Sequence, residues 1–199
     1  MNMGTSPATV WSLAFLGELV RGGVREIVVS PGSRSQALAL AADMVSRLDE
    51  TDFRLHVVID ERSAGFFGLG LAAQSHRPVV LLCTSGSAPA HYLPALLEAR
   101  HSGIPMIALT ADRPAELRRG GANQTTNQVA MFGQAVHASF DVPAPAERDG
   151  LAEEARGYAR EAVSLSKTGA EWGRPGPIHI NTAFREPLSS AISSESGTG

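Results

Sequence analysis

The sequence predicts an α/β domain with a doubly wound, parallel sheet of about six strands and helices on both faces. Short runs rich in Val, Ile and Leu alternate along the chain with helical stretches of about 10–15 residues, which is typical of a parallel sheet with crossover helices. The strand-like runs are almost continuously apolar, as expected for strands buried on both faces. Hydrophobic residues make up 43% and charged residues 19% of the chain, which excludes wholesale disorder.

The first half of the chain supplies four predicted helices and three predicted strands. Apolar residues recur at helical spacing from residue 9 to a Gly-Gly pair at 22–23, which is a plausible helix end. A β-branched run then predicts a strand, and a Pro-Gly-Ser turn leads into the next helix. The same alternation continues, and it predicts strands over 26–30, 55–59 and 79–83, with helices over 9–22, 36–47, 61–74 and 88–101.

The second half is less regular. An apolar run predicts a strand over 105–110, and a polar segment over 111–128 follows it. A weaker strand near 135–140, a helix over 151–164 and a strand over 177–181 complete the series. We expect residues 1–188 to form one domain. The Ser/Gly/Glu-rich residues 189–199 have little to bury and are expected to be a flexible tail or the start of an interdomain linker.

Composition excludes several classes of protein. The formal net charge is −3, so no basic field points to nucleic acid. The one cysteine, Cys83, ends an apolar run and is expected to be a core residue; no Cys/His spacing resembles a zinc site. The N-terminus lacks the pattern of a signal peptide, and no stretch of about 18 apolar residues occurs. We therefore expect a cytoplasmic protein without a membrane span.

Polar residues follow each of the first four predicted strands. In an open parallel sheet, ligands bind at the carboxyl ends of the strands near the point where the strand order reverses. We therefore expect these segments to converge at one edge of the sheet: SPGSRS at 30–35, DERS at 60–63, TSGS at 84–87 and TADRP at 110–114.

The first of these segments has two interpretations. Ser33 or Ser35 could simply cap the following helix. Alternatively, Arg34 lies at a helix N-terminus, where backbone N–H groups and the helix dipole favour an anion. The residues alone do not favour either interpretation over the other.

Glu61 also has a structural alternative. An acid in the first turn of a helix is stabilised by the helix dipole, so Glu61 needs no catalytic role, and the residues alone favour this reading. If a partner covered the strand end, however, the carboxyl group would be buried and its pKa raised, as in catalytic acids. His91, early in a later helix, could face the same site.

The glycine-containing turns differ in what they indicate. The small residues Thr84, Ser85 and Gly86 open a helix and suit a phosphate, a carboxylate or a flat ring. The sequence GLGLAA at 68–73 matches a dinucleotide fingerprint but begins eight residues past Asp60, inside a predicted helix, so it indicates tight helix packing instead.

The segment from Arg113 to Gln128 is too long for a simple connection between strand and helix. Its arginines and its amides, including Asn123 and Gln124, suit a polar ligand or a neighbouring subunit. The alternative is a disordered loop.

Five motifs together resemble a known family. The motifs are SPGSRS at 30–35, DERSAG at 60–65, TSGSA at 84–88, TADRP at 110–114 and GANQ at 121–124. Their order and spacings resemble those in the N-terminal, pyrimidine-binding domain of thiamine-diphosphate enzymes, in particular the synthases of menaquinone biosynthesis. Each motif alone is weak, and the resemblance covers about residues 9–188.

The resemblance implies a chemistry. It gives Glu61 the role of bonding N1′ of the cofactor's aminopyrimidine and promoting the imino tautomer that removes the thiazolium C2 proton. It implies decarboxylation of 2-oxoglutarate and addition of the four-carbon remainder to isochorismate, with Mg²⁺ as second cofactor. It places Thr84, Ser85 and Gly86 beside the cofactor. It places Ser33, Arg34, Arg113, Asn123 and Gln124 on the substrate side, where the arginines would bind carboxylates.

One departure limits the resemblance. Such enzymes bind the diphosphate and Mg²⁺ in a separate domain through a Gly-Asp-Gly motif, which this chain lacks, and no metal ligands are expected here. We therefore expect an N-terminal domain that is inactive alone and carries half of an active site shared between subunits of a homo-oligomer (dimer or tetramer). Two alternatives stay open: a free-standing, non-catalytic domain that binds a small carboxylate or assists assembly, and the same domain of an acetolactate-synthase-type enzyme.

Overall fold

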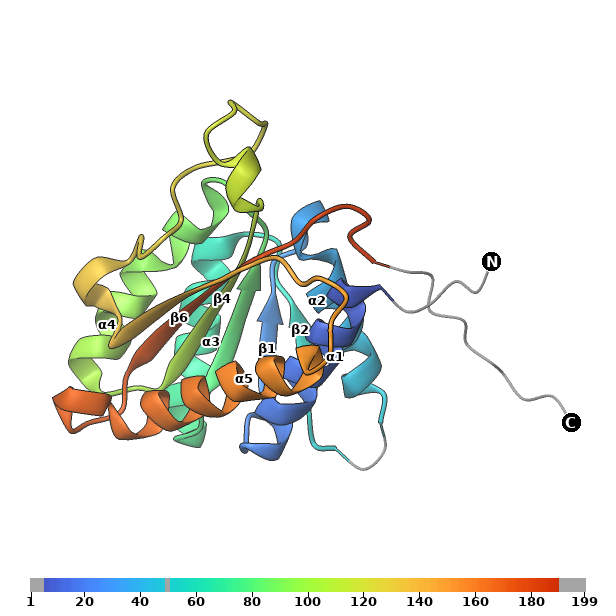
Figure 1. Cartoon of the computed structure of the whole chain (residues 1–199). Helices are drawn as coiled ribbons and strands as arrows, with labels where there is room; N and C mark the ends of the chain where they lie inside the picture. The colour runs from blue at the N-terminus through green and yellow to red at the C-terminus, as the bar shows by residue number, and fades with distance from the viewer. Residues whose placement is uncertain (1–5, 49–50, 190–199) are drawn as a thin grey trace, which may run out of the picture.

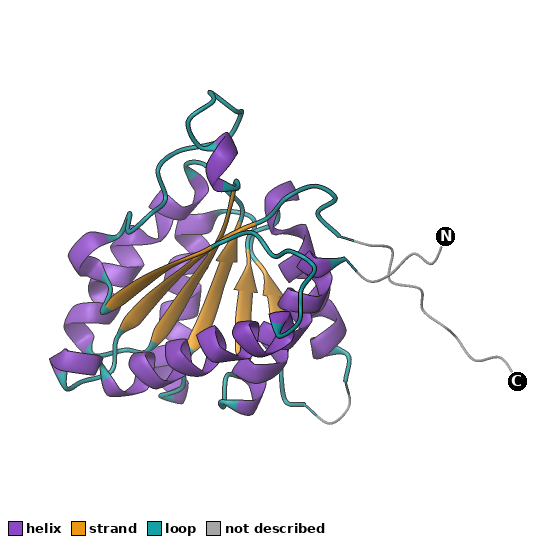
Figure 2. Cartoon of the chain, viewed as in Figure 1, coloured by secondary structure: helices purple, strands orange, loops and turns teal. Residues whose placement is uncertain are grey.

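A six-stranded parallel sheet in the order β2-β1-β3-β4-β6-β5 forms the centre of the molecule (Figures 1 and 2). The computed structural model describes residues 6–48 and 51–189. Every pair of neighbouring strands is parallel, which confirms the predicted fold class. The strands are β1 (Glu26–Val29), β2 (Arg54–Val57), β3 (Val79–Cys83), β4 (Met106–Asp112), β5 (Ala138–Val142) and β6 (Pro177–Ala183).

Helices cover both faces of this sheet. The α-helices are α1 (Pro7–Arg21), α2 (Gln36–Ser46), α3 (Glu61–Ser75), α4 (Leu93–Ser102) and α5 (Leu151–Thr168). Successive strand residues point to opposite faces. In β6, Ile178 and Ile180 pack into the core beneath α1, α2 and α5, whereas the smaller core on the other face joins β3 and β4 to α3 and α4. None of the helices in the described part of the chain is long and apolar enough to cross a membrane.

Small residues bring α3 close to the sheet. A Cβ atom at Gly68 would overlap the side chain of Leu81 on β3, and one at Gly65 would lie 3.1 Å from the Cβ atom of Ala95 on α4. The GLGLAA sequence therefore serves helix packing, as predicted. Cys83 is fully buried and lies in the core, also as predicted.

Several element boundaries differ from the predictions, three of them for a clear physical reason. The predicted helix over 88–101 is a 3₁₀ turn, η2 (Ala88–Tyr92), followed by α4; Pro89 and Pro94 lack the N–H groups that a continuous helix would use. The predicted strand over 135–140 begins later, at Ala138, because a 3₁₀ turn, η4 (Gly133–Ala135), precedes it. Strand β4 continues to Asp112 because its last residues pair with β6.

Strand β1 pairs with β2 on one side and with β3 on the other, so the chain moves in one direction along the sheet after β1 and in the other direction after β2. The strand order thus reverses between β1 and β3, and a ligand site is expected at the carboxyl ends of these two strands. The segment 113–128 rises above the same edge of the sheet (Figure 1). Apart from Ser189, the predicted tail over 189–199 lies outside the described residues.

Candidate active site

The loops that follow β1 and β3 touch at the reversal point. A Cβ atom at Gly32 would overlap the side chain of Thr84, so only glycine allows the two loops to approach this closely. Thr84 is 5% exposed, and its hydroxyl oxygen is buried without a hydrogen-bond partner among the described residues. A buried hydroxyl without a partner is costly, so the donor and acceptor capacity of this atom is unused within the described residues.

Arg34 is a buried cation in a 3₁₀ turn, η1 (Ser33–Ser35), which precedes α2. The residue is only 7% exposed. Its Nη1 atom donates to the carbonyl oxygen of Phe184 at 3.0 Å, and Nη2 lies 3.3 Å from the exposed carboxylate of Glu186. Its Nε atom is buried and has no hydrogen-bond partner in the described part of the chain. Burial, and then the like charge of Arg113, lower the pKa of Arg34 below its ordinary value.

Arg113 brings a second guanidinium to the same place. Its backbone N–H donates to the carboxylate of Asp112 at 2.7 Å, and its carbonyl oxygen accepts from Arg118 at 3.0 Å. The backbone is thus fixed, but the Nη1 atom is buried and unpaired within the described residues. Two neighbouring cations with unused N–H groups form a site that an anionic ligand would stabilise. That these two guanidinium groups bind an anion stays a prediction.

The alternative in which the side chain of Ser33 or Ser35 caps the following helix is wrong. Ser35 precedes α2, but its hydroxyl donates to the carbonyl oxygen of Gly32 at 3.0 Å and makes no capping bond to the helix. The 3₁₀ turn explains the difference, because it brings the hydroxyl of Ser35 back onto the preceding loop. Ser33 is exposed at the start of this turn.

Glu61 begins α3 and is half-buried. Asp60 caps the helix, since its Oδ1 atom accepts from the backbone N–H of Ser63 at 2.7 Å, so the fold does not need Glu61 as a cap. Glu61 has no hydrogen bond or ion pair with any other described residue. It lies near Cys83 and Tyr92: burial raises the pKa of both groups, and the negative charge of Glu61 adds to the effect.

The segment 113–128 is ordered against the β3 loop. The hydroxyl of Ser85 donates to the carbonyl oxygen of Gln124 at 2.9 Å, and Nε2 of Gln124 donates to the carbonyl oxygen of Ser85 at 3.2 Å. Gly86 has a φ of 88°, and a Cβ atom there would lie 2.9 Å from Gln124. The fold therefore brings Gln124 to the Thr84–Gly86 turn.

Two other candidates are less firmly placed. The side chain of Asn123 is exposed, and its backbone carbonyl oxygen accepts from the hydroxyl of Thr125 at 3.1 Å. His91 is exposed and lies near the first turn of α3, where its charge helps to lower the pKa of Asp60 after two larger contributions from Ser63.

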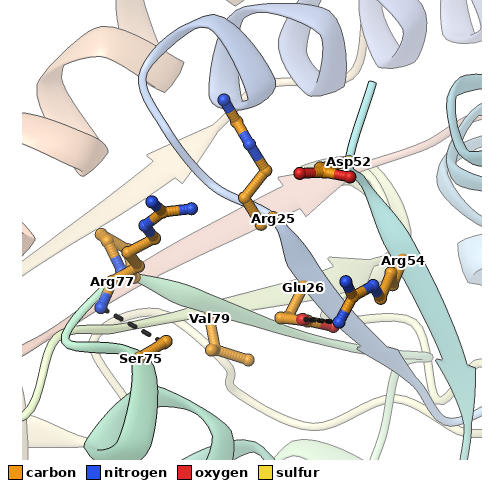
Figure 3. Close-up of a pocket in the computed structure, with 8 residues that line it drawn as sticks. Arg25, Glu26, Asp52, Arg54, Ser75, Arg77 and Val79 are labelled. Carbon is orange, nitrogen blue, oxygen red and sulfur yellow. Dashed lines mark hydrogen bonds and ion pairs between the residues drawn. The ribbon is translucent and has the colours of Figure 1, made fainter. Parts of the chain in front are cut away.

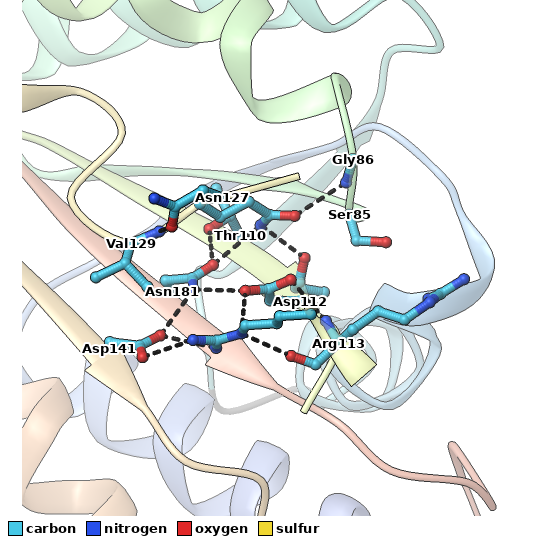
Figure 4. Close-up of polar contacts among 12 residues, drawn as sticks. Ser85, Gly86, Thr110, Asp112, Arg113, Asn127, Val129, Asp141 and Asn181 are labelled. Carbon is cyan, nitrogen blue, oxygen red and sulfur yellow. Dashed lines mark hydrogen bonds and ion pairs between the residues drawn. The ribbon is translucent and has the colours of Figure 1, made fainter. Parts of the chain in front are cut away.

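The sequence interpretation missed the polar network beneath the segment (Figure 4). Gln128 and Asn181 are fully buried, and they connect β4, β5 and β6 to the Gly86 loop. The available signal was the presence of polar residues in two buried strands: Thr110 and Asp112 in β4, and His179, Asn181 and Thr182 in β6.

The opposite edge of the sheet offers a different surface. A hollow of about 130 Å³ lies at the amino ends of β1, β2 and β3 (Figure 3). Arg54 there lies 3.5 Å from Glu26, and Arg25 donates to backbone carbonyl oxygens of Val20 and Val24. This hollow contains none of the predicted site residues. Among the described residues, no group of three or more His, Cys, Asp or Glu could hold a metal ion.

Known proteins are similar to this chain over most of its length. The family model of the thiamine pyrophosphate enzyme N-terminal TPP binding domain matches residues 12–131. A 2-succinyl-5-enolpyruvyl-6-hydroxy-3-cyclohexene-1-carboxylate synthase from Leifsonia xyli subsp. xyli is 51% identical over 188 residues, which are 94% of this chain and 31% of the relative. Enzymes of the same name from Dechloromonas aromatica and Thermobifida fusca are 49% and 48% identical, over 94% and 92% of this chain and 33% and 32% of theirs. The chain thus spans about a third of the length of these relatives.

Proposed function

Because this chain belongs to the family of thiamine pyrophosphate enzyme N-terminal TPP binding domains, we propose that it forms the pyrimidine-binding part of a 2-succinyl-5-enolpyruvyl-6-hydroxy-3-cyclohexene-1-carboxylate synthase. This enzyme, a transferase that forms a C–C bond, would decarboxylate 2-oxoglutarate and add the four-carbon remainder to isochorismate in menaquinone biosynthesis. The shared name of the similar relatives supports this synthase over an acetolactate-synthase-type enzyme.

The observation that carries the proposal is the pair of Arg34 and Arg113. Each has a buried guanidinium nitrogen without a partner in the described chain, and the two charges are close enough to disfavour each other. Both proposed substrates are carboxylates. Charge-assisted hydrogen bonds to a carboxylate would satisfy the unused N–H groups and offset the repulsion. Gln124, and Ser33 and Asn123 at the exposed rim, would contribute polar contacts to the same substrate.

The residues beside this pair fit an aminopyrimidine ring, which carries both hydrogen-bond donors and acceptors. Thr84 has an unpaired buried hydroxyl, the turn through Ser85 and Gly86 follows it directly, and Glu61 has a half-buried carboxylate with no partner in the described chain. When bound, thiamine diphosphate supplies the carbon nucleophile that attacks a 2-oxo acid. Glu61 would hold a proton at the pyrimidine N1′ atom, and the arginines would orient the substrate carboxylates.

The rest of the cofactor would be held by residues outside this chain. The described residues contain no cluster suited to Mg²⁺, and the relatives are about three times as long. We propose that the chain alone is inactive. Isothermal calorimetry of the 199-residue chain with thiamine diphosphate and Mg²⁺ should show no tight binding; a micromolar dissociation constant would contradict this part of the proposal.

The partner that completes the site is proposed to be another subunit. Apolar side chains are exposed on neighbouring helices: Phe66 and Phe67 on α3, and Leu93 and Leu97 on α4 are 37–44% exposed. An apolar surface of this kind beside Glu61 supports a homo-oligomer whose subunits share the active site. A cytoplasmic location is proposed with it.

The experiment is a synthase assay of the full-length protein. Carbon dioxide release from 2-oxoglutarate should require thiamine diphosphate and Mg²⁺, and the adduct with isochorismate should appear by mass spectrometry. Pyruvate in place of 2-oxoglutarate is the matched control. Turnover of pyruvate with a second 2-oxo acid would favour the acetolactate-synthase type, and binding of a carboxylate without turnover of any 2-oxo acid would favour a non-catalytic domain.

A further inference from the structure

A fully buried asparagine joins three strands below the candidate site (Figure 4). Asn181 on β6 lies in register with Thr110 on β4 and with Asp141 on β5. Its Nδ2 atom donates to Asp112 at 2.9 Å and to Asp141 at 2.8 Å, and its Oδ1 atom accepts from Thr110 at 2.9 Å. Because all of its donors and acceptors can be used, the amide has one favourable orientation.

The neighbouring hydrogen bonds fix this orientation further. The hydroxyl proton of Thr110 is given to Asn181, so the same hydroxyl must accept from Nε2 of His179 at 2.9 Å. Nδ1 of His179 then accepts from the hydroxyl of Ser139 at 3.0 Å. This arrangement requires a neutral histidine, and burial lowers the pKa of His179 to about 4. The network therefore has a single proton arrangement at neutral pH.

Gln128 extends the network to the active-site loops. Its Nε2 atom donates to Oδ1 of Asn181 at 3.0 Å and to the carbonyl oxygen of Ala111 at 3.1 Å. Its Oε1 atom accepts from the backbone N–H of Gly86 at 2.9 Å. A single buried side chain thus connects the end of segment 113–128, the sheet, and the loop proposed to border the cofactor.

The beginning of the same segment is attached to the same group of residues. Arg118 donates through Nη1 and Nη2 to the carboxylate of Asp141, at 2.8 and 2.9 Å. Its Nε atom lies 2.9 Å from Asp112 and donates to the carbonyl oxygen of Arg113. Both ends of segment 113–128 are therefore held by side chains that also bond Asn181.

We propose that Gln128 and Asn181 are positioning residues that hold segment 113–128 against the Gly86 loop. They keep Gln124 and Arg113 facing the candidate site without contacting the ligand themselves. A segment of sixteen residues with only one 3₁₀ turn, η3 (Ala115–Leu117), would otherwise gain little from local structure. The identity of the ligand that Gln124 and Arg113 recognise rests on the proposed function. The attachment of segment 113–128 by Gln128 and Asn181 does not.

The attachment is tested by hydrogen–deuterium exchange of the 199-residue chain. Gln128→Met keeps the side-chain volume and removes the three hydrogen bonds. Exchange at Gly86 and across 113–128 should become at least about tenfold faster, while the exchange of β1 and β3 stays slow. Thr182→Val is the matched control: Thr182 neighbours Asn181 on β6, faces the other side of the sheet, and its buried hydroxyl has no partner in the described chain. Unchanged exchange across 113–128 in Gln128→Met, or an equal effect of the control, would overturn the proposal.

A second variant tests the same proposal if Gln128→Met does not fold. Should Gln128→Met not fold, Gln128→Glu keeps an acceptor for Gly86 but, as a carboxylate, has no donor for Ala111 and Asn181. Segment 113–128 should then exchange faster while Gly86 stays slow. Slow exchange in both places would overturn the role of the amide.

Kinetics of the full-length synthase separate positioning from stability. Gln128→Met should raise the KM of a carboxylate substrate about tenfold or more, with a smaller change in kcat. A variant that was only less stable would lose active enzyme and kcat while its KM stayed unchanged, and that result would overturn the positioning role. If the unaltered protein showed no synthase activity, the proposed function would fail, and the exchange experiment alone would decide the attachment.

Discussion

Replacing Arg34 by Met should remove anion binding while changing the free energy of unfolding by less than about 2 kcal/mol. The guanidinium makes one charge-assisted bond, to the carbonyl oxygen of Phe184, which contributes about 1.5–3 kcal/mol. Its ion pair with the exposed Glu186 contributes about 0–1 kcal/mol. The buried, unpaired Nε atom costs about 1–3 kcal/mol, and the repulsion from Arg113 adds to this cost. Gains and losses thus nearly cancel.

The ligand response should change much more than the stability. Succinate at ten times its dissociation constant should stabilise the unaltered chain by about 1.4 kcal/mol. For a chain of this length, that corresponds to a rise in Tm of about 3–6 °C. We expect this rise to be absent in Arg34→Met. Differential scanning calorimetry measures both quantities, with sodium chloride at matched ionic strength to correct for screening.

Arg185→Met is the matched control for this measurement. Arg185 is exposed and pairs with Glu116 at 2.6 Å, so its replacement should leave the succinate response intact. An equal response to succinate in Arg34→Met and the unaltered chain would refute the anion site. A loss of more than about 3 kcal/mol in the absence of ligand would show that Arg34 instead anchors the segment after β6.

Four further outcomes are expected. In the full-length synthase, Glu61→Gln should lower kcat at least about 100-fold, because the amide cannot exchange a proton with the cofactor, while the Tm changes little; near-normal turnover would make Glu61 only a helix-start acid. Arg113→Ala should lower kcat/KM for a carboxylate substrate roughly 10- to 150-fold, and Arg113→Lys should recover only part of it; unchanged substrate constants with weakened cofactor binding would contradict this assignment. The pKa of His179 is about 4 in the fold and near 6.5 when exposed, so the unfolded chain binds more protons between these values. The free energy of unfolding should therefore fall by up to about 3 kcal/mol as the pH drops from about 6.5 to 4, and denaturant titrations that show no such loss from this histidine would contradict its buried, neutral state. Finally, sedimentation should detect self-association of the 199-residue chain at high concentration, weakened by Leu97→Glu on α4 but not by Leu40→Glu on α2; a strict monomer would count against the proposed subunit surface.

The sequence by itself determined the fold class and the placement of most candidate residues. Apolar runs that end in polar turns predicted all six strands, because burial on both faces of a parallel sheet leaves a pattern that is local in the sequence. Parallel strands bring their carboxyl ends to one edge, so the convergence of Arg34, Thr84 and Arg113 followed from the strand assignment. The small residues of α3 likewise predicted its close packing on β3.

Only the tertiary structure decided which polar residues are buried and what they bond. Gln124 and Gln128 look alike in a polar segment, yet one lies exposed over the Ser85 loop and the other is fully buried. The difference depends on Gly86 and Asn181, which lie 42 and 53 residues from Gln128 in the sequence. Hydrophobic periodicity is a local property of the chain, whereas a buried hydrogen bond requires two distant groups to meet. The unpaired nitrogens of Arg34 and Arg113, which carry the functional argument, could be identified only once every neighbouring acceptor had been placed.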